Sequence, residues 1–167
     1  MTCKNILFSG PPGCGKSTLI ERIIQRIETP ATGFFTREIR EKGQRVGFSI
    51  NTLDRKQGLL AHKSIKSRYR VGKYGVNLAD IDQIAVPSMM PERPDALVVI
   101  DEIGKMECFS ELFRETLVNV LDSNHRVIGS ISLKGDRFIR KIKTRGDVLL
   151  VHVSQHNRNE LVDKYFT

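Results

Sequence analysis

The chain has 167 residues, of which 40% are hydrophobic and 28% are charged, and it carries a formal net charge of +8. This size and balance predict one globular domain, residues 1–167, with a full hydrophobic core. No apolar run could cross a bilayer, the first residues lack a signal-peptide pattern, and Cys3, Cys14 and Cys108 show no CxxC spacing. A membrane protein and a disulfide scaffold are thereby excluded, and we expect a cytoplasmic protein with free thiols. The positive charge fits an anionic partner, either nucleotides or nucleic acid.

The first predicted element is a short apolar strand, Ile6–Ser9. Directly after it comes the glycine-rich sequence Gly10-Pro11-Pro12-Gly13-Cys14-Gly15-Lys16-Ser17-Thr18. It fits G-x-x-x-x-G-K-[ST], the pattern of a phosphate-binding loop. Apolar residues at helical spacing then predict a helix over Ser17–Ile27. Strand, loop and helix in this order are the context that the motif requires, so Gly10–Thr18 are predicted to bind a nucleotide.

Each fixed position of the loop has a physical role. The glycines allow positive φ, which brings backbone N–H groups close to phosphate oxygens, and the helix that follows aims its first amides at the same anion. Lys16 is the predicted catalytic cation beside the β- and γ-phosphates. The Ser17 hydroxyl is the predicted ligand of Mg²⁺.

The next third of the chain predicts consecutive strands at Gly33–Arg37, Arg45–Asn51 and Gly58–Ala61, with a hairpin turn over 41–44. Such a series indicates an antiparallel insertion at one edge of a sheet. The basic segment 62–75 contains two tyrosines, so it is either a basic loop or a surface that stacks on a base or a single strand. A helix over Leu78–Ala85 and a proline-rich connection, 87–94, complete this part.

The strand Ala96–Ile100 runs into two carboxylates, Asp101 and Glu102. An acidic residue at the carboxyl end of a parallel strand lies in the ligand crevice, which is the Walker B arrangement. We expect Asp101 to hold Mg²⁺ beside Ser17, and Glu102 to act as the general base that polarises water. Lys105 follows closely and either approaches the nucleotide or is a surface lysine. Glu107 is expected to be an acid at a helix N-terminus near Ser110.

The last third predicts a helix over Glu111–Asp122, strands at Arg126–Ile131 and Val148–Val153, and a helix over Arg158–Lys164. Between the two strands, segment 134–145 reads as a solvated amphipathic helix, in which Arg137 could serve as an arginine finger. The four histidines do not have metal-ligand spacing. Alternating strands and helices predict an α/β sandwich with a mostly parallel central sheet.

Further motifs occur in order along the chain. They are Gly33-Phe34-Phe35-Thr36-Arg37-Glu38-Ile39-Arg40, Gly43-Gln44-Arg45-Val46-Gly47-Phe48, Arg70-Val71-Gly72-Lys73-Tyr74-Gly75-Val76-Asn77 and Val99-Ile100-Asp101-Glu102-Ile103-Gly104-Lys105-Met106-Glu107. Together with the phosphate loop, this pattern resembles the small stand-alone P-loop nucleoside-triphosphatase family that includes the human cancer-related NTPase and thermophile relatives.

The resemblance implies a RecA-like, three-layer P-loop fold with an additional strand. It also implies slow, Mg²⁺-dependent hydrolysis of several nucleoside triphosphates, ATP and GTP among them, to the diphosphate and phosphate. By the same resemblance, the nucleotide is lined by Gly10–Thr18 and by the strand and loop made of Val98, Val99, Ile100, Asp101, Glu102, Ile103, Gly104 and Lys105.

Two other functions remain open at this stage. A nucleotide or polynucleotide kinase would have similar size, and the antiparallel insertion would be its acceptor site. A nucleotide-gated RNA-binding module fits the basic charge, although no RNA-binding motif is present. Glu102 beside Asp101 favours activated water over an acceptor hydroxyl. We expect a monomer that does not bind membranes.

Overall fold

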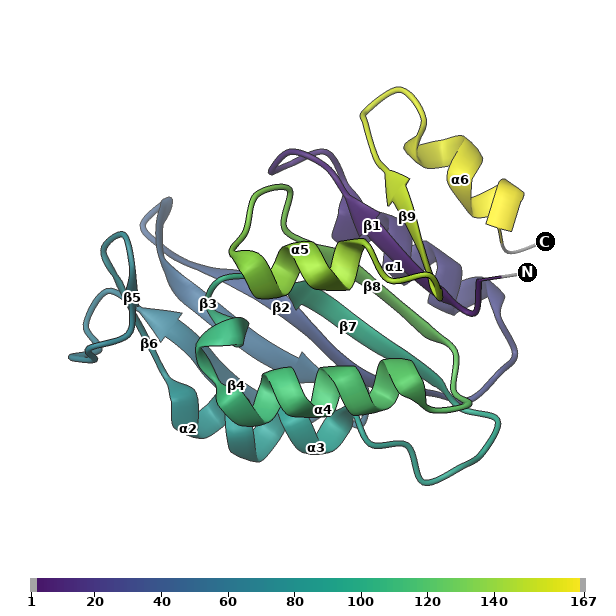
Figure 1. Ribbon diagram of the computed structural model, residues 1–167. Coiled ribbons are helices and arrows are strands. Elements are labelled where there is room, and N and C mark those ends of the chain that lie inside the picture. Colours follow the sequence, from purple (N-terminus) through teal and green to yellow (C-terminus); the bar gives the residue numbers. More distant parts are fainter. Residues whose placement is uncertain (1–2, 166–167) are drawn as a thin grey trace.

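The computed structural model describes residues 3–165, and in this range the strands form one nine-stranded sheet in the order β5-β6-β4-β3-β2-β7-β8-β1-β9 (Figure 1). The strands are β1 (Asn5–Ser9), β2 (Ala31–Glu41), β3 (Gln44–Thr52), β4 (Gln57–His62), β5 (Arg70–Val71), β6 (Tyr74–Val76), β7 (Leu97–Ile103), β8 (Val127–Ile131) and β9 (Val148–His152). The helical elements are α1 (Lys16–Arg26), α2 (Leu78–Asp80), η1 (Ile81–Ala85), α3 (Val86–Ser88), η2 (Glu107–Phe109), α4 (Glu111–Asp122), α5 (Arg137–Lys143) and α6 (Arg158–Tyr165).

Helices cover both faces of the parallel part of the sheet, in which β2, β7, β8, β1 and β9 run in one direction. Figure 1 shows α4 and α5 across the near face, with α1 behind the sheet. Strand β7 is apolar without interruption because it is buried on both sides: Val99 packs in the core on the α1 and α6 side, and Val98 and Ile100 pack on the α4 side. The predicted α/β fold is therefore confirmed.

Helix α1 is positioned by its two ends. Its first residue, Lys16, directly follows Gly15, which has a left-handed φ of 100°. Leu19, Ile20 and Ile23 are buried against the sheet, and the helix ends where Ile27 turns to extended backbone. The loop between β1 and α1 is thus fixed by a buried strand on one side and an anchored helix on the other.

The predicted antiparallel insertion is also present. Strand β2 is longer than expected: residues 31–35 pair in parallel with β7, and residues 34–41 pair antiparallel with β3. The turn from β2 to β3 has two residues, Lys42 and Gly43, with φ values of 49° and 78°. Positive φ at both positions gives the tight hairpin whose twist matches the strands. β4, β6 and β5 continue the sheet, so the basic segment 62–75 contains a small hairpin instead of a plain loop.

Two of the predicted helices differ in detail from the helices in the structure. The helix expected over 78–85 is divided into α2, the π-helical turn η1 and α3, where the Val86 N–H bonds to the Ile81 carbonyl and Pro87 follows at the start of α3. The amphipathic segment 134–145 forms α5, whose Ile139 and Ile142 are buried and whose first turn is capped by Asp136. Across residues 3–165 there is no helix of the length and apolarity that spanning a membrane requires.

Candidate active site

A cleft of about 650 Å³ opens at the carboxyl ends of β1, β7 and β8 and continues over the antiparallel strands. Three groups of residues line it, together with Ser132 after β8 and Arg158 of α6. The first is the loop after β1, from Pro12 to Thr18; the second is the acidic end of β7 and the turn after it; the third consists of side chains from β2, β3, β4 and β5. The carboxyl ends of parallel strands are the usual ligand side of an α/β sheet.

The loop 10–18 is held by close contacts that only glycine allows. A Cβ on Gly10 would lie 2.4 Å from the carbonyl oxygen of Val153. At Gly15, which already has positive φ, a Cβ would lie 3.0 Å from both Cδ and Nη1 of Arg158. The guanidinium of Arg158, at the start of α6, therefore packs against the loop and lines the cleft. Substitution at either glycine would displace the loop.

The Lys16 side chain folds back over its own loop. Its Nζ donates to the carbonyl oxygen of Gly10 at 2.7 Å and to that of Pro11 at 3.2 Å, and it lies 3.9 Å from Sγ of Cys14. Cys14 itself is buried, which fits a small filler beneath the loop. The ammonium is thus satisfied by exchangeable carbonyl contacts at the mouth of the cleft.

Asp101 is almost completely buried, with 1% of its surface exposed. Its Oδ1 accepts a hydrogen bond from Ser130 Oγ at 2.5 Å. Burial raises the pKa of Asp101, and the hydroxyls of Ser130 and Ser17 oppose the rise. Oδ2 is buried and has no hydrogen-bond partner among residues 3–165. An unpaired carboxylate oxygen beside a serine hydroxyl is the donor chemistry that Mg²⁺ takes, so these residues fit that cation.

Glu102 and Glu107 converge on the space above Gly104. A Cβ there would lie 2.7 Å from Glu102 Oε1, 2.9 Å from Glu107 Oε2 and 3.2 Å from Ser132 Oγ. Burial first, and then the charge of Asp101, raise the pKa of Glu102, while Lys16 and a hydrogen bond from Ser132 oppose the rise. Burial and the neighbouring Glu102 raise the pKa of Glu107 well above its ordinary value.

The position of Glu107 differs from the expected helix N-terminus. It begins the 3₁₀ turn η2, before α4, and its side chain is 4% exposed and faces the acidic pair. Ser110 caps α4 instead, accepting a hydrogen bond from the Phe113 N–H at 3.0 Å. Glu107 is therefore part of the cleft.

A family model described as NTPase matches residues 5–166. The chain belongs to the NTPase family. Nucleoside-triphosphatase THEP1 of Thermotoga sp. (strain RQ2) is 44% identical over 160 residues, which cover 95% of this chain and 91% of the relative. The Homo sapiens cancer-related nucleoside-triphosphatase is 34% identical over 181 residues, covering 98% and 95%. The crystal structure of THEP1 from the hyperthermophile Aquifex aeolicus superposes with a TM-score of 0.86 at 31% identity, covering 96% of this chain and 95% of that one.

In this NTPase-family chain, part of the predicted nucleotide-lining set lies outside the cleft. The side chains of Val98, Val99, Ile100 and Ile103 are completely buried in the two cores, because β7 is covered on both faces. They support the site but do not line it. Gly10, Pro11, Cys14 and Gly104 shape the adjoining turns without lining the cleft, and Lys105 lines it. Arg137 is exposed at the start of α5 and is absent from the lining.

Several residues in or beside the cleft were not among the predicted site residues. Ser132 follows β8, and Ser130, which bonds Asp101, lies on it; a small polar residue at the end of a parallel strand is the one signal that could have found them. Arg37 comes from β2 and donates to Glu21 of α1. Its positive charge lowers the pKa of Asp101, so it lies near the acidic pair.

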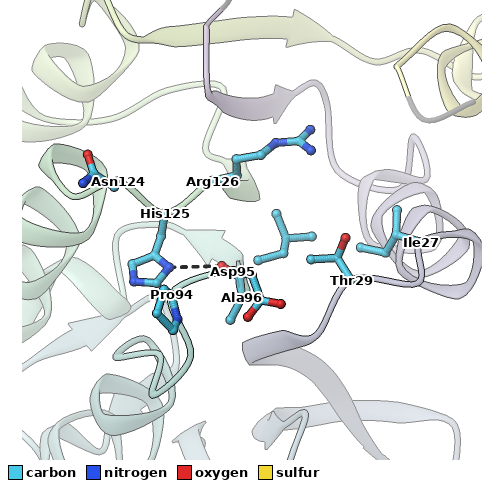
Figure 2. Close-up of a pocket in the computed structure, with 9 residues that line it drawn as sticks. Ile27, Thr29, Pro94, Asp95, Ala96, Asn124, His125 and Arg126 are labelled. Atoms are coloured by element: carbon cyan, nitrogen blue, oxygen red, sulfur yellow. Dashed lines mark hydrogen bonds between the residues drawn. The ribbon is translucent and has the colours of Figure 1, made fainter.

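A smaller hollow of about 190 Å³ lies at the other end of the sheet of this NTPase-family chain, where β2, β7 and β8 begin (Figure 2). His125 points into it, and its Nδ1 lies 3.2 Å from the carbonyl oxygen of Ala96 (Figure 2). Because a carbonyl only accepts, that nitrogen carries the proton. No residue of the phosphate loop or the acidic pair lines this hollow, so we do not place the active site there.

Proposed function

We propose that this protein is a RecA-like P-loop enzyme that hydrolyses nucleoside triphosphates, ATP and GTP among them, to the diphosphate and phosphate with Mg²⁺. The observation that carries the proposal is that the loop 10–18 and the carboxylates of Asp101 and Glu102 share one cleft. A single strand, β8, separates the loop strand β1 from the acidic strand β7. This extra strand between the loop strand and the acidic strand supports the additional-strand type of P-loop fold. The membership of the NTPase family supports the hydrolysis of nucleoside triphosphates.

In this proposal the loop holds the phosphates. Backbone N–H groups of the loop and the first turn of α1 point at the anion, where the helix dipole adds a favourable field. The Lys16 ammonium exchanges the Gly10 and Pro11 carbonyls for β- and γ-phosphate oxygens. None of these contacts reads a base, which suits the use of several nucleoside triphosphates.

The metal would be held by Ser17 and by Asp101, whose Oδ2 lacks another partner among residues 3–165. Bound there, Mg²⁺ supplies positive charge to the β- and γ-phosphate oxygens. Ser130 contributes by holding the other carboxylate oxygen, which leaves Oδ2 as the oxygen without a partner among residues 3–165.

We assign Glu102 as the general base that accepts a proton from the attacking water. Burial raises the pKa of Glu102, and the charge of Lys16 and the Ser132 hydroxyl oppose that rise. A carboxylate with a raised pKa is a stronger base, so it accepts a proton from attacking water more readily. Burial and the neighbouring Glu102 raise the pKa of Glu107, which favours its neutral form and so limits the negative charge beside the phosphates.

Incubation with γ-labelled ATP and Mg²⁺ tests the proposal. We expect free labelled phosphate to appear with the protein alone and the amount to be independent of added RNA. Label retained on ATP, with RNA held in a salt-sensitive manner, would instead identify the nucleotide-gated binding module.

We further propose a single domain that works in the cytoplasm. The nine strands of the described part share one sheet, and Cys3, Cys14 and Cys108 are free thiols, as is usual in a reducing compartment.

A further inference from the structure

The cleft extends beyond the acidic pair, over the antiparallel strands. We call this part the outer pocket; it consists of Arg45 and Phe48 from β3, Leu60 from β4, Val71 from β5 and Met106 from the turn after β7. In the sheet, β2 separates β3 from the acidic strand β7, on the side away from the phosphate loop. The outer pocket therefore lies on the far side of Asp101 and Glu102 from the loop.

The direction of a bound triphosphate follows from the same strand order. Lys16 on α1 marks the β- and γ-phosphates, and Glu102 and Ser132 mark the γ end. The nucleoside then lies on the opposite side, towards Arg158 at the β9 edge. Hydrolysis needs only one water next to the γ-phosphorus, about 30 Å³ of liquid volume. A second ligand would lie in the lined part of the cleft beyond that point.

The outer pocket has a cation in a fixed orientation. Arg45 Nε donates to the Tyr74 hydroxyl at 3.0 Å, and Nη1 donates to Glu38 at 3.1 Å. Cζ lies 5.2 Å from the centre of the Phe48 ring and 5.6 Å from that of Tyr74. Nη2 has no acceptor among residues 3–165, and 45% of the side chain is exposed. A guanidinium held in this way is prepared to receive the oxygens of a phosphate.

Glu38, the ion-pair partner of Arg45, also lines the cleft, and the other walls of the outer pocket are apolar. Phe48 packs edge-on against Tyr74, with ring centres 5.3 Å apart, so the orientation of its ring is fixed. Leu60 is buried, and Val71 and Met106 are half-buried. A rigid aromatic ring among aliphatic side chains suits a flat aromatic ligand, and a flexible methionine adapts to its outline. A water molecule alone would gain no binding free energy from contact with these apolar side chains.

We propose that the outer pocket binds a phosphorylated aromatic molecule of the nucleoside monophosphate class, which accepts the γ-phosphoryl group in place of water. The inference rests on the proposed function, because that function places the γ-phosphate. A phosphate oxygen of the monophosphate dianion forms a bond to the γ-phosphorus, and the bond from that phosphorus to the β–γ bridging oxygen breaks. Two diphosphates result, charge is conserved, and no proton moves. Transfer therefore does not need Glu102 as a base, whereas hydrolysis does.

Calorimetry on the whole protein tests the binding. The protein is loaded with Mg²⁺ and the β,γ-imido analogue of ATP and titrated with AMP, CMP, GMP and UMP; adenosine and ribose 5-phosphate are the arms that lack the phosphate or the aromatic ring. At least one monophosphate should bind ten times or more tightly than either partial molecule. Arg45→Met should weaken it at least tenfold. Arg40→Met is the matched control, because Arg40 also pairs with Glu38 but does not line the cleft.

If Arg45→Met proves unstable, Val71→Glu places a negative charge in the same pocket and should also weaken binding at least tenfold. Analogue binding without binding of any monophosphate overturns the inference and leaves the proposed function intact. Failure to bind the analogue overturns the proposed function, and the inference falls with it. Equal affinity for a monophosphate and for ribose 5-phosphate would refute the proposal that the pocket recognises an aromatic ring.

Transfer is measured with γ-labelled ATP and the monophosphate that binds. Label should move to the monophosphate, and Glu102→Gln should lower the release of free phosphate at least a hundredfold while transfer stays within about threefold of wild type. Binding with no labelled diphosphate, or an equal loss of transfer and hydrolysis in Glu102→Gln, would contradict the acceptor role.

Discussion

The ammonium of Lys16 lies 2.7 Å from the carbonyl oxygen of Gly10, six residues earlier in the same loop. The loop therefore supplies the lysine with a hydrogen-bond acceptor when phosphate is absent. The cation is held at the mouth of the cleft and is ready to exchange a neutral acceptor for a charged one.

Lys16→Ala should abolish hydrolysis. The variant leaves the charge that develops on the γ-phosphate uncompensated, and loss of one such contact costs about 3–4 kcal/mol, or a hundredfold to a thousandfold in kcat. Steady-state phosphate release measures it. Lys141→Ala, on the exposed side of α5, is the control and should retain full activity. Turnover near wild type in a folded Lys16→Ala protein would refute the role of the loop.

Removal of metal should stop the reaction. We expect no phosphate release in EDTA and recovery with Mg²⁺ or Mn²⁺, which both prefer oxygen ligands. Asp101→Asn should raise the Mg²⁺ concentration needed for half-maximal rate at least tenfold, because the amide supplies less charge to the ion. Asp95→Asn, at the smaller hollow, is the control. Hydrolysis that persists after EDTA treatment would exclude the roles given to Ser17 and Asp101.

Glu102→Gln should separate nucleotide binding from chemistry. The amide keeps the shape of the side chain but loses its basicity, so ATP and Mg²⁺ should bind with unchanged affinity. Turnover should fall by roughly a hundredfold to ten-thousandfold. Calorimetry and single-turnover phosphate release on one sample measure both quantities. Unchanged turnover would make Glu102 a structural acid.

Glu107→Gln should make the protein more stable at neutral pH. Because the folded pKa of Glu107 is raised, its contribution to stability is complete below the ordinary glutamate value of about 4.3 and is lost as pH rises through the folded pKa. Glutamine does not ionise, so the variant keeps that stability as the pH rises. Each kcal/mol gained in the free energy of unfolding should raise Tm by about 2–4 °C. The two proteins should converge near pH 4 in thermal melts. Glu111→Gln, exposed on α4, should show no such pH-dependent gain.

Local patterns predicted the parts of the fold that local residues determine. The loop 10–18 is a contiguous motif, and the short continuous apolar run of β7, bounded by a proline-rich segment, indicates a strand covered on both faces. The hairpin at Lys42 and Gly43 follows from turn chemistry. These features needed no knowledge of the strand order.

The contacts that sequence reasoning missed join distant residues. Arg158 reaches Gly15, Ser130 reaches Asp101, and Arg45 reaches Tyr74, in each case across separate elements. Strand order and register decide which of these meet, and hydrophobic periodicity gives neither. Glu107 begins a helical turn near Ser110 as expected, but that turn is η2, which directs the side chain into the interior, and the sequence pattern did not indicate this burial.

The packing of Val153 and Arg158 against the glycines of the loop has a consequence for synthesis on the ribosome. The loop emerges before β9 and α6, which brace it. A nascent chain that ends before residue 148 would carry the complete loop motif without the neighbours that shape it. We therefore expect nascent chains to acquire nucleotide affinity only when β9 has paired with β1, so nucleotide would bind selectively to chains in which both segments have folded together.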